Sequence, residues 1–234
     1  MESKLKLEKM KNLLLKLKKL ANDFGLEFNA KKFNVVFIPK EEVILYLYLV
    51  GCPDREYSKY GKTHIQRIKN IERFLQSNEF HILKRKYAGT IIEKKALKKI
   101  KLSKIQNLKI RTKATKLVKE LRRKESLAAL LPIIKNQKER KFFLNIVLFH
   151  EWIHTLLLEN GIYFQRKTFA KWYLDEGLVS YMQLFSEKRI SDLSNKANNY
   201  KNSNVRKGFL IWNKLLKDKL TPKERHNAIL ARKI

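Results

Sequence analysis

A nearly continuous apolar segment between residues 142 and 158 is the feature that most restricts how this chain can fold. Its apolar side chains would cover most of the circumference of a helix, which is typical of a helix buried in a globular core. The pentapeptide His150-Glu151-Trp152-Ile153-His154 interrupts this segment with three polar residues. Because an unpaired charge in a protein core is costly, these three side chains need a partner that satisfies all of them.

A metal ion with a bound water molecule would be such a partner. Residues four apart lie on one face of a helix, so His150 and His154 can present ring nitrogens to a single ion. Glu151 points roughly 100° round the helix, where its carboxylate can border the open coordination position of the ion. This is the His-Glu-x-x-His arrangement of zincin metallopeptidases, and it predicts a zinc site with Glu151 as the catalytic base.

A third ligand is expected in a second apolar segment, from Trp172 to Phe185, which has helical periodicity. Catalytic zinc commonly has three protein ligands, and two histidines with one glutamate are a known set. Glu176 follows His154 after 21 intervening residues, which is enough for a helix end, a loop and the start of a second helix. Gly177 has no side chain, and we expect it to let the two helices approach closely beside the metal.

The stretch His150-Glu151-x-x-His154, with Asp175-Glu176-Gly177-x-x-Ser180-Tyr181 downstream, resembles the gluzincin clan of zinc metallopeptidases over residues 140 to 188. In length and expected intracellular setting the chain is most similar to the minigluzincins, soluble minimal relatives of membrane CAAX-type proteases. The resemblance implies zinc-dependent peptide hydrolysis with one catalytic zinc ion. The implied zinc ligands are His150, His154 and Glu176, and the implied general base and acid, acting on the zinc-bound water, is Glu151.

The sequence departs from the gluzincin pattern at Ser180, where some members have an aspartate that orients a ligand histidine. A neutral hydroxyl supports a ligand less strongly than a carboxylate. Ser180 and Asp175 are the candidates for this supporting role. The Gly-x-Met-Glu-Asn motif of gluzincin aminopeptidases is missing, which favours an endopeptidase. The donor that stabilises the oxyanion stays open, and the candidates are Tyr163, Tyr181, Tyr200 and His226.

Net charge is the second strong signal, at +31 from 53 Lys and Arg against 22 Asp and Glu. From Lys84 to Lys124 the only acids are Glu93 and Glu120. One interpretation is a set of solvated helical faces, but ion-pair networks need both signs of charge. The other is an anionic partner, either nucleic acid or an acidic protein, that binds the 84–124 stretch. No sequence-specific nucleic-acid motif accompanies the stretch.

Two further functions stay open beside the peptide hydrolase. The protein could be a nucleic-acid-associated protein whose protease acts at DNA, or a non-catalytic module that only binds zinc. The intact Glu151 argues against the second, because a structural metal site needs no base beside its ligand.

The cysteine content and the hydropathy pattern indicate a cytoplasmic protein. Cys52 is the only cysteine, so an internal disulfide cannot form, which fits a reducing compartment. No charge-free stretch approaches the roughly 18 to 20 apolar residues of a membrane span, and the amino terminus does not resemble a signal peptide. We therefore expect no transmembrane segment.

The patterns together predict an α+β, mainly helical fold with a small mixed or antiparallel sheet above the active-site helix. Strands are expected at residues 33–38, 43–50 and 80–88. Besides the two zinc-site helices, helices are expected at residues 5–24, 65–76, 93–105, 113–124, 205–220 and 222–232. The last of these begins with Thr221, Pro222 and Glu224, which form a capping-box pattern.

The expected domains follow the order of the chain. Residues 1–25 would form an amphipathic helix, and residues 26–190 the metallopeptidase domain with its zinc core at 140–188. A polar linker at 191–204 would lead to a helical appendage at 205–234. This appendage could complete the fold, or it could cover the cleft and hold the enzyme latent, as in the self-inhibited proforms of minigluzincins.

Overall fold

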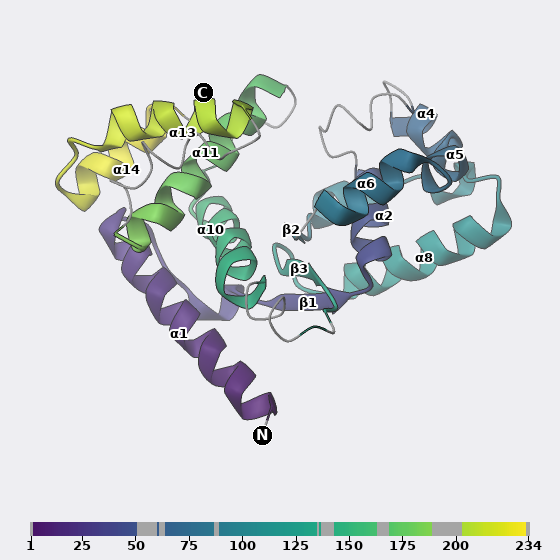
Figure 1. The fold of residues 1–234 in the computed structure, drawn as a ribbon, viewed down its shortest axis with the longest axis horizontal. Coiled ribbons are helices and arrows are strands. Elements are labelled where there is room, and N and C mark those ends of the chain that lie inside the picture. The colour runs from purple at the N-terminus through teal and green to yellow at the C-terminus, as the bar shows by residue number, and fades with distance from the viewer. Residues whose placement is uncertain are drawn as a thin grey trace. The chain divides into compact units, whose positions relative to one another are not determined.

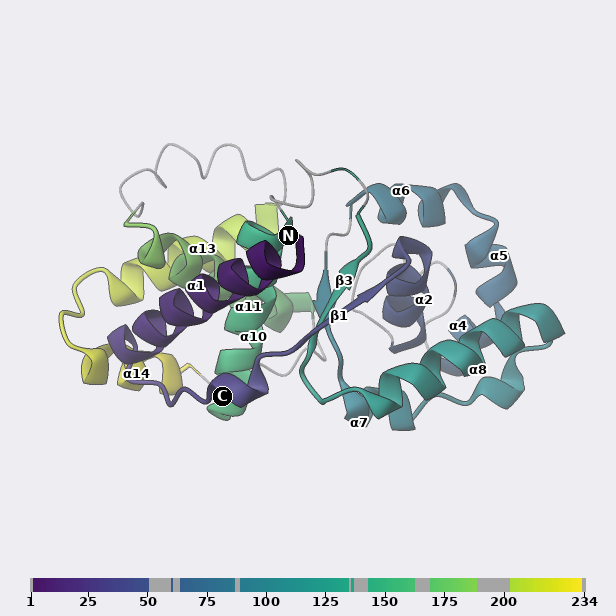
Figure 2. The same ribbon diagram turned by 90° about the horizontal axis from the view of Figure 1, so that it is seen from below.

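The computed structural model describes residues 2–50, 60, 64–86, 89–134, 136, 143–162, 169–188 and 203–232. The chain divides into two compact units. The helical unit comprises Met1–Lys31 with Leu144–Ile234, and the sheet unit comprises Lys32–Phe143. These boundaries differ from the expected domains, because the first helix, the zinc-site helices and the C-terminal helices share one unit (Figures 1 and 2).

The sheet unit contains a mixed three-stranded sheet in the order β1-β3-β2. Strand β1 (Val35–Ile38) pairs in parallel with β3 (Ala129–Pro132), which is buried along its whole length. Strand β2 (Thr90–Ile91) pairs with β3 in the antiparallel direction. The small sheet and the many helices confirm the predicted mainly helical α+β class.

Helices supply most of the buried core of this unit. They are α2 (Lys40–Val50), α4 (His64–Lys69), α5 (Ile71–Leu75), α6 (Asn78–Lys86), α7 (Lys94–Lys98) and α8 (Leu108–Arg123), with 3-10 turns at Ala30–Lys32 and Leu102–Lys104. The helix expected at residues 65–76 is broken at Asn70, and the one expected at 93–105 ends early and continues as a 3-10 turn.

The strand predicted at residues 43–50 is wrong, because this segment forms α2. Every residue from Val43 to Leu49 is buried. An unbroken apolar run fits a buried strand as well as a helix that is covered on all sides, so periodicity alone does not separate them. The start of the segment favours the helix. The carbonyl of Pro39 accepts a hydrogen bond from the Val43 amide, and Glu41 and Glu42 suit the positive end of the helix dipole.

The strand predicted at residues 80–88 is also wrong, since α6 covers residues 78–86. The hydroxyl of Ser77 accepts a hydrogen bond from the Phe80 amide at 3.3 Å and so caps the first turn of the helix. Phe80 and Leu83, three residues apart, face the core, whereas Ile82 is exposed. This spacing is helical, and the strand begins only at β2.

The helical unit consists of α1 (Glu2–Asp23), α10 (Leu148–Glu159), α11 (Phe169–Ser186), α13 (Ser203–Leu216) and α14 (Pro222–Leu230). A π turn at Phe143–Val147 leads into α10. All residues of α10 from Leu148 to Leu157 are buried except His150, which confirms the expected burial of this helix. It ends at Asn160 and Gly161, where the positive φ of 65° at Gly161 stops the helix as expected.

Helices α11 and α13 cross at a pair of glycines and lie side by side in Figures 1 and 2. A methyl group at Gly177 would overlap the backbone of Gly208 and Phe209, and one at Gly208 would overlap the Tyr173 carbonyl. The expectation that Gly177 allows close approach to the active-site helix is therefore corrected: the neighbour that requires a glycine here is α13, not α10.

The C-terminal helices follow the predicted pattern, including the capping box at Thr221 and Glu224. They also pack on the rest of the helical unit. The indole of Trp212 donates to the Leu174 carbonyl at 2.7 Å, and the Arg225 guanidinium donates to the Asp23 carbonyl at 2.7 Å. The linker expected at residues 191–204 lies outside the described residues up to residue 202. None of the helices in the described part of the chain has the length and apolarity to cross a membrane.

Candidate metal centre

Three of the predicted site residues come together between α10 and α11. His150 and His154 are one turn apart on α10, and their rings lie 5.0 Å apart at an interplanar angle of 74°. Glu176 faces both from α11. One ligand atom from each of the three residues lies within 4.8 Å of the other two. Nε2 of His150 is 3.3 Å from one Glu176 carboxylate oxygen, and Nε2 of His154 is 3.5 Å from the other.

This grouping places the three side chains where one zinc ion could contact all of them. Zinc binds imidazole nitrogen and carboxylate oxygen at about 2.0–2.2 Å, so neighbouring ligands of a tetrahedral site are about 3.4 Å apart. The two measured nitrogen–oxygen distances, 3.3 and 3.5 Å, lie close to this value. The donor set, two imidazoles and one carboxylate, is also one that catalytic zinc sites use. The residues present therefore fit zinc.

Asp175 adds negative charge to this cluster on the Nδ1 side of the His154 ring. Its carboxylate lies 3.5 Å from Nδ1 of His154, a distance at which the contact is mainly electrostatic. Burial lowers the pKa of His154, but the carboxylates of Asp175 and Glu176 more than offset it and raise this pKa to about 10. Burial likewise raises the pKa of Glu176, and the two histidines more than offset it and hold that pKa well below its ordinary value. Two carboxylates beside a buried imidazole favour a bound cation.

Of the two candidates for a supporting role, Asp175 and Ser180, Asp175 is the one whose carboxylate faces a histidine of the cluster. Asp175 and Ser180 are both buried on α11. Among the contacts of the described residues, none joins Ser180 to a histidine. The carboxylate beside the histidine therefore comes from the residue directly before Glu176, and Ser180 is not in this position.

Gln183 is a site residue that the sequence reasoning missed. Its side-chain oxygen lies 3.2 Å from Nδ1 of His150. Gln183 follows Glu176 by seven residues, or about two helical turns, so both lie on the same face of α11. That spacing is the signal from which it could have been found.

The remaining predicted residues lie elsewhere or are not described. Glu151 is buried on α10 beside His150, with 7% of its surface exposed, and is not a member of the three-residue cluster. Tyr181 is a core residue whose ring packs against Phe24 and Phe209. His226 contacts the carbonyl of Gly25 at 2.7 Å through Nδ1. Tyr163 and Tyr200 lie outside the described residues.

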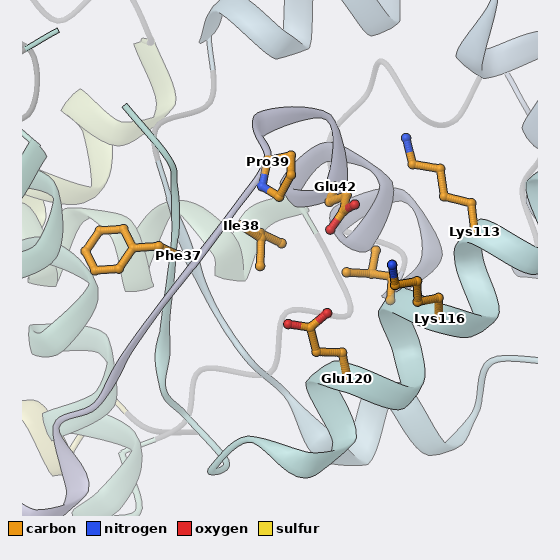
Figure 3. A pocket seen from close by; sticks show the side chains of 8 residues that line it. Phe37, Ile38, Pro39, Glu42, Lys113, Lys116 and Glu120 are labelled. Atoms are coloured by element: carbon orange, nitrogen blue, oxygen red, sulfur yellow. The ribbon is translucent and has the colours of Figure 1, made fainter. Parts of the chain in front are cut away.

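A separate pocket of about 220 Å³ lies within the sheet unit, between the end of β1, the start of α2 and α8 (Figure 3). Its polar side chains are two glutamates and two lysines, so their charges balance. It contains no histidine and none of the predicted site residues. The residues that line it are Phe37, Ile38, Pro39, Glu42, Lys113, Lys116, Leu117 and Glu120.

Comparisons of the chain with protein-family models, with curated proteins and with solved structures give no match. The case for a function therefore rests on the residues and the geometry of this chain.

Proposed function

We propose that the protein is a zinc-dependent peptide hydrolase of the gluzincin type, with His150, His154 and Glu176 as the ligands of one zinc ion. The observation that carries this proposal is the convergence of one possible ligand atom from each of the three residues to within 4.8 Å of the other two. Glu151 occupies the position next to the first histidine, where zincins place their base. A structural zinc site would not need this carboxylate.

The chemistry divides between the ion and the chain. A zinc ion held by these residues would polarise the scissile carbonyl and lower the pKa of a water molecule toward about 7. Glu151 would take the proton of the attacking water and then deliver it to the leaving amine nitrogen as the carbon–nitrogen bond breaks. Asp175 would hold the His154 ring in place through Nδ1. We infer an endopeptidase, because the sequence lacks the motif with which gluzincin aminopeptidases bind an amino terminus.

The test is hydrolysis of an internally quenched peptide library by zinc-loaded wild type and by Glu151→Gln. We expect Glu151→Gln to keep its zinc and to lose roughly 10²- to 10⁴-fold in kcat/KM, which is the usual contribution of a general base. Glu159→Gln, which changes an exposed glutamate of the same helix, should behave as wild type. A wild type that binds zinc but cleaves nothing would leave the non-catalytic zinc module as the function.

A second candidate function, binding to nucleic acid, is supported by the basic surface of the sheet unit. Residues 89–134, all described, carry 14 Lys and Arg against three Glu. On α8 the residues Ala114, Leu117 and Leu121 are buried in the core. Lys109, Lys116 and Arg123 are exposed and lie seven residues apart, in one row on the opposite face.

The burial of the apolar face of α8 favours nucleic acid over a membrane as the anionic partner. An amphipathic helix binds a bilayer by inserting its apolar face, and here that face is covered by the protein core. The exposed face of α8 carries a row of cations, and such a row can contact successive phosphates of a nucleic-acid backbone. Because the chain has a single cysteine and nucleic acid is the proposed partner, we propose that the protein is cytoplasmic.

The affinity for a short DNA duplex, measured across salt concentrations, tests this second function. We expect the logarithm of affinity to fall linearly with the logarithm of salt, by about 0.9 per phosphate contact. The triple variant Lys109→Glu, Lys116→Glu, Arg123→Glu should bind much more weakly. A control with the same net charge, Lys11→Glu, Lys18→Glu, Lys207→Glu, changes exposed lysines of the helical unit. Equal loss in both variants would show that α8 is not the binding surface.

A further inference from the structure

The side-chain amide of Gln183 on α11 bridges two groups of the active-site helix region. Its oxygen lies 3.2 Å from Nδ1 of His150, and its nitrogen lies 3.4 Å from the carbonyl oxygen of Ile146. Ile146 belongs to the π turn that precedes α10. Single π turns of this kind are frequent at functional sites.

The Ile146 carbonyl fixes the orientation of the amide. A carbonyl oxygen can only accept hydrogen bonds, so the nitrogen of Gln183 must face it as the donor. The oxygen of Gln183 then faces His150 as an acceptor. The Nδ1 atom of His150 must therefore carry the hydrogen, and its Nε2 atom is left with the free lone pair.

That lone pair points to the Glu176 carboxylate, from which Nε2 is 3.3 Å away. Two acceptors at this distance repel each other unless a proton or a metal ion lies between them, and a metal ion replaces the proton when it binds. The bridge from Gln183 thus presents His150 in the tautomer and orientation that a metal ion requires. The ring of His154 also lies between two partners, since Asp175 faces its Nδ1 and Glu176 faces its Nε2.

We propose that Gln183 is a positioning residue of the metal centre, whose side-chain oxygen accepts a hydrogen bond from Nδ1 of His150 and so holds the ring in its Nδ1-protonated form. This inference rests on the proposed zinc site. Partners of this kind fix the ring orientation of metal-binding histidines, and their loss typically costs 10- to 100-fold in metal affinity.

The test is the zinc dissociation constant, measured by competition with a chromophoric chelator for wild type, Gln183→Leu and Gln183→Glu. Leucine has a similar volume but no acceptor, and we expect it to weaken zinc binding roughly 10- to 100-fold. Glutamate keeps an acceptor for Nδ1–H and should restore most of the affinity. Gln106→Leu, which makes the same change at an exposed position of the sheet unit, should bind zinc as wild type.

The outcomes separate this inference from the proposed function. A cooperative unfolding transition in the presence of chelator shows that a variant is folded without zinc. If Gln183→Leu does not fold, the comparison of Gln183→Glu with wild type still tests the role of the acceptor. Wild-type affinity in Gln183→Leu, or equal losses in the leucine and glutamate variants, would overturn the role of Gln183 and leave the zinc site intact. A wild type that binds no zinc would instead overturn the proposed function and this inference with it.

Discussion

The two histidines proposed as zinc ligands face different partners. His154 faces the carboxylate of Asp175, whereas His150 faces the neutral amide of Gln183. A carboxylate partner makes an imidazole a stronger metal ligand than an amide partner does. The reason is that the carboxylate stabilises the positive charge that builds up on the ring. For the proposed zinc ion, the buried pair of His154 and Asp175 would therefore be the more strongly stabilising of the two.

Replacing Asp175 with asparagine should accordingly weaken zinc binding, by about tenfold or more. The dissociation constant for zinc is the measurement, with Asp218→Asn as a control at an exposed aspartate of the same unit. Ser180→Ala should leave the constant unchanged, because no described contact joins Ser180 to a ligand. The assignment fails if Ser180→Ala weakens zinc binding and Asp175→Asn does not.

Glu41 provides a pH-dependent contact in the sheet unit. Its hydrogen bond and ion pair with Lys84 hold the pKa of Glu41 below its ordinary value. The pair therefore stabilises the fold at pH values above the ordinary pKa, and this stabilisation is lost as the pH falls through the lowered pKa. Both side chains are more than a third exposed, so the contribution is below about 1 kcal/mol.

Urea unfolding at low salt, at pH 6 and pH 3, measures this contribution. Wild type should be the more stable protein at pH 6, and Glu41→Gln should match it at pH 3. A difference that is as large at pH 3 as at pH 6 would show that the carboxylate charge is not responsible.

The cluster of His150, His154 and Glu176 could be predicted from the sequence because it depends largely on local spacing. His150, His154 and the base Glu151 lie within one helical turn, and Glu176 stands out as an acid in an apolar helix. For Gln183 the spacing from Glu176 indicates only that both residues share one face of α11. Its contact with His150 depends on how α10 and α11 are rotated about their axes, which no local pattern encodes.

At the scale of elements, the patterns with clear helical periodicity were predicted well and the unbroken apolar runs were not. Helices α1, α8 and α14 alternate polar and apolar faces, and their positions are confirmed. In helix α2 the segment from Val43 to Val50 is apolar throughout, and this pattern fits a strand equally well. Its burial on all sides results from tertiary packing, which removes the polar face that would have revealed the helix.

The glycine crossing between α11 and α13 gives a prediction for stability. Gly208→Ala would place a methyl group on the Tyr173 carbonyl, and backbone cannot yield as a flexible side chain does. Overpacking of this kind typically costs about 1–3 kcal/mol, which exceeds the gain of about 1 kcal/mol from replacing glycine with alanine in a helix. Denaturant unfolding should therefore show a less stable protein.

Lys207→Ala is the matched control for this substitution, since residue 207 neighbours the crossing and is exposed. It should change stability by less than about 0.5 kcal/mol. A Gly208→Ala protein as stable as this control would show that α11 and α13 do not approach as closely as described.

At the scale of the whole molecule, the chain leaves the helical unit after α1 and returns to it before α10. Contacts such as that between Arg225 and Asp23, 202 positions apart in the sequence, close this unit. Such long-range pairings leave no periodic signal, which is why the sequence suggested consecutive domains. The packing of α13 and α14 on α11 and α1 supports the interpretation that the C-terminal helices complete the fold.

Zinc should stabilise the two units differently, because all three proposed ligands belong to the helical unit. At a free zinc concentration of 100 times the dissociation constant, the stabilisation is about 2.7 kcal/mol. Hydrogen exchange should slow in α10 and α11 and stay unchanged in α2 and α8. Equal protection of both units would contradict a zinc site confined to the helical unit.

The zinc content of purified protein is the measurement that tests the central claim most directly. Wild type, His154→Ala and Glu176→Ala should be compared after equilibrium dialysis against zinc, together with His81→Ala as a control at an exposed histidine of the sheet unit. We predict a single zinc ion per chain in wild type and His81→Ala, and close to none in the two ligand variants. Wild type without zinc, or Glu176→Ala with full zinc content, would contradict the proposed centre.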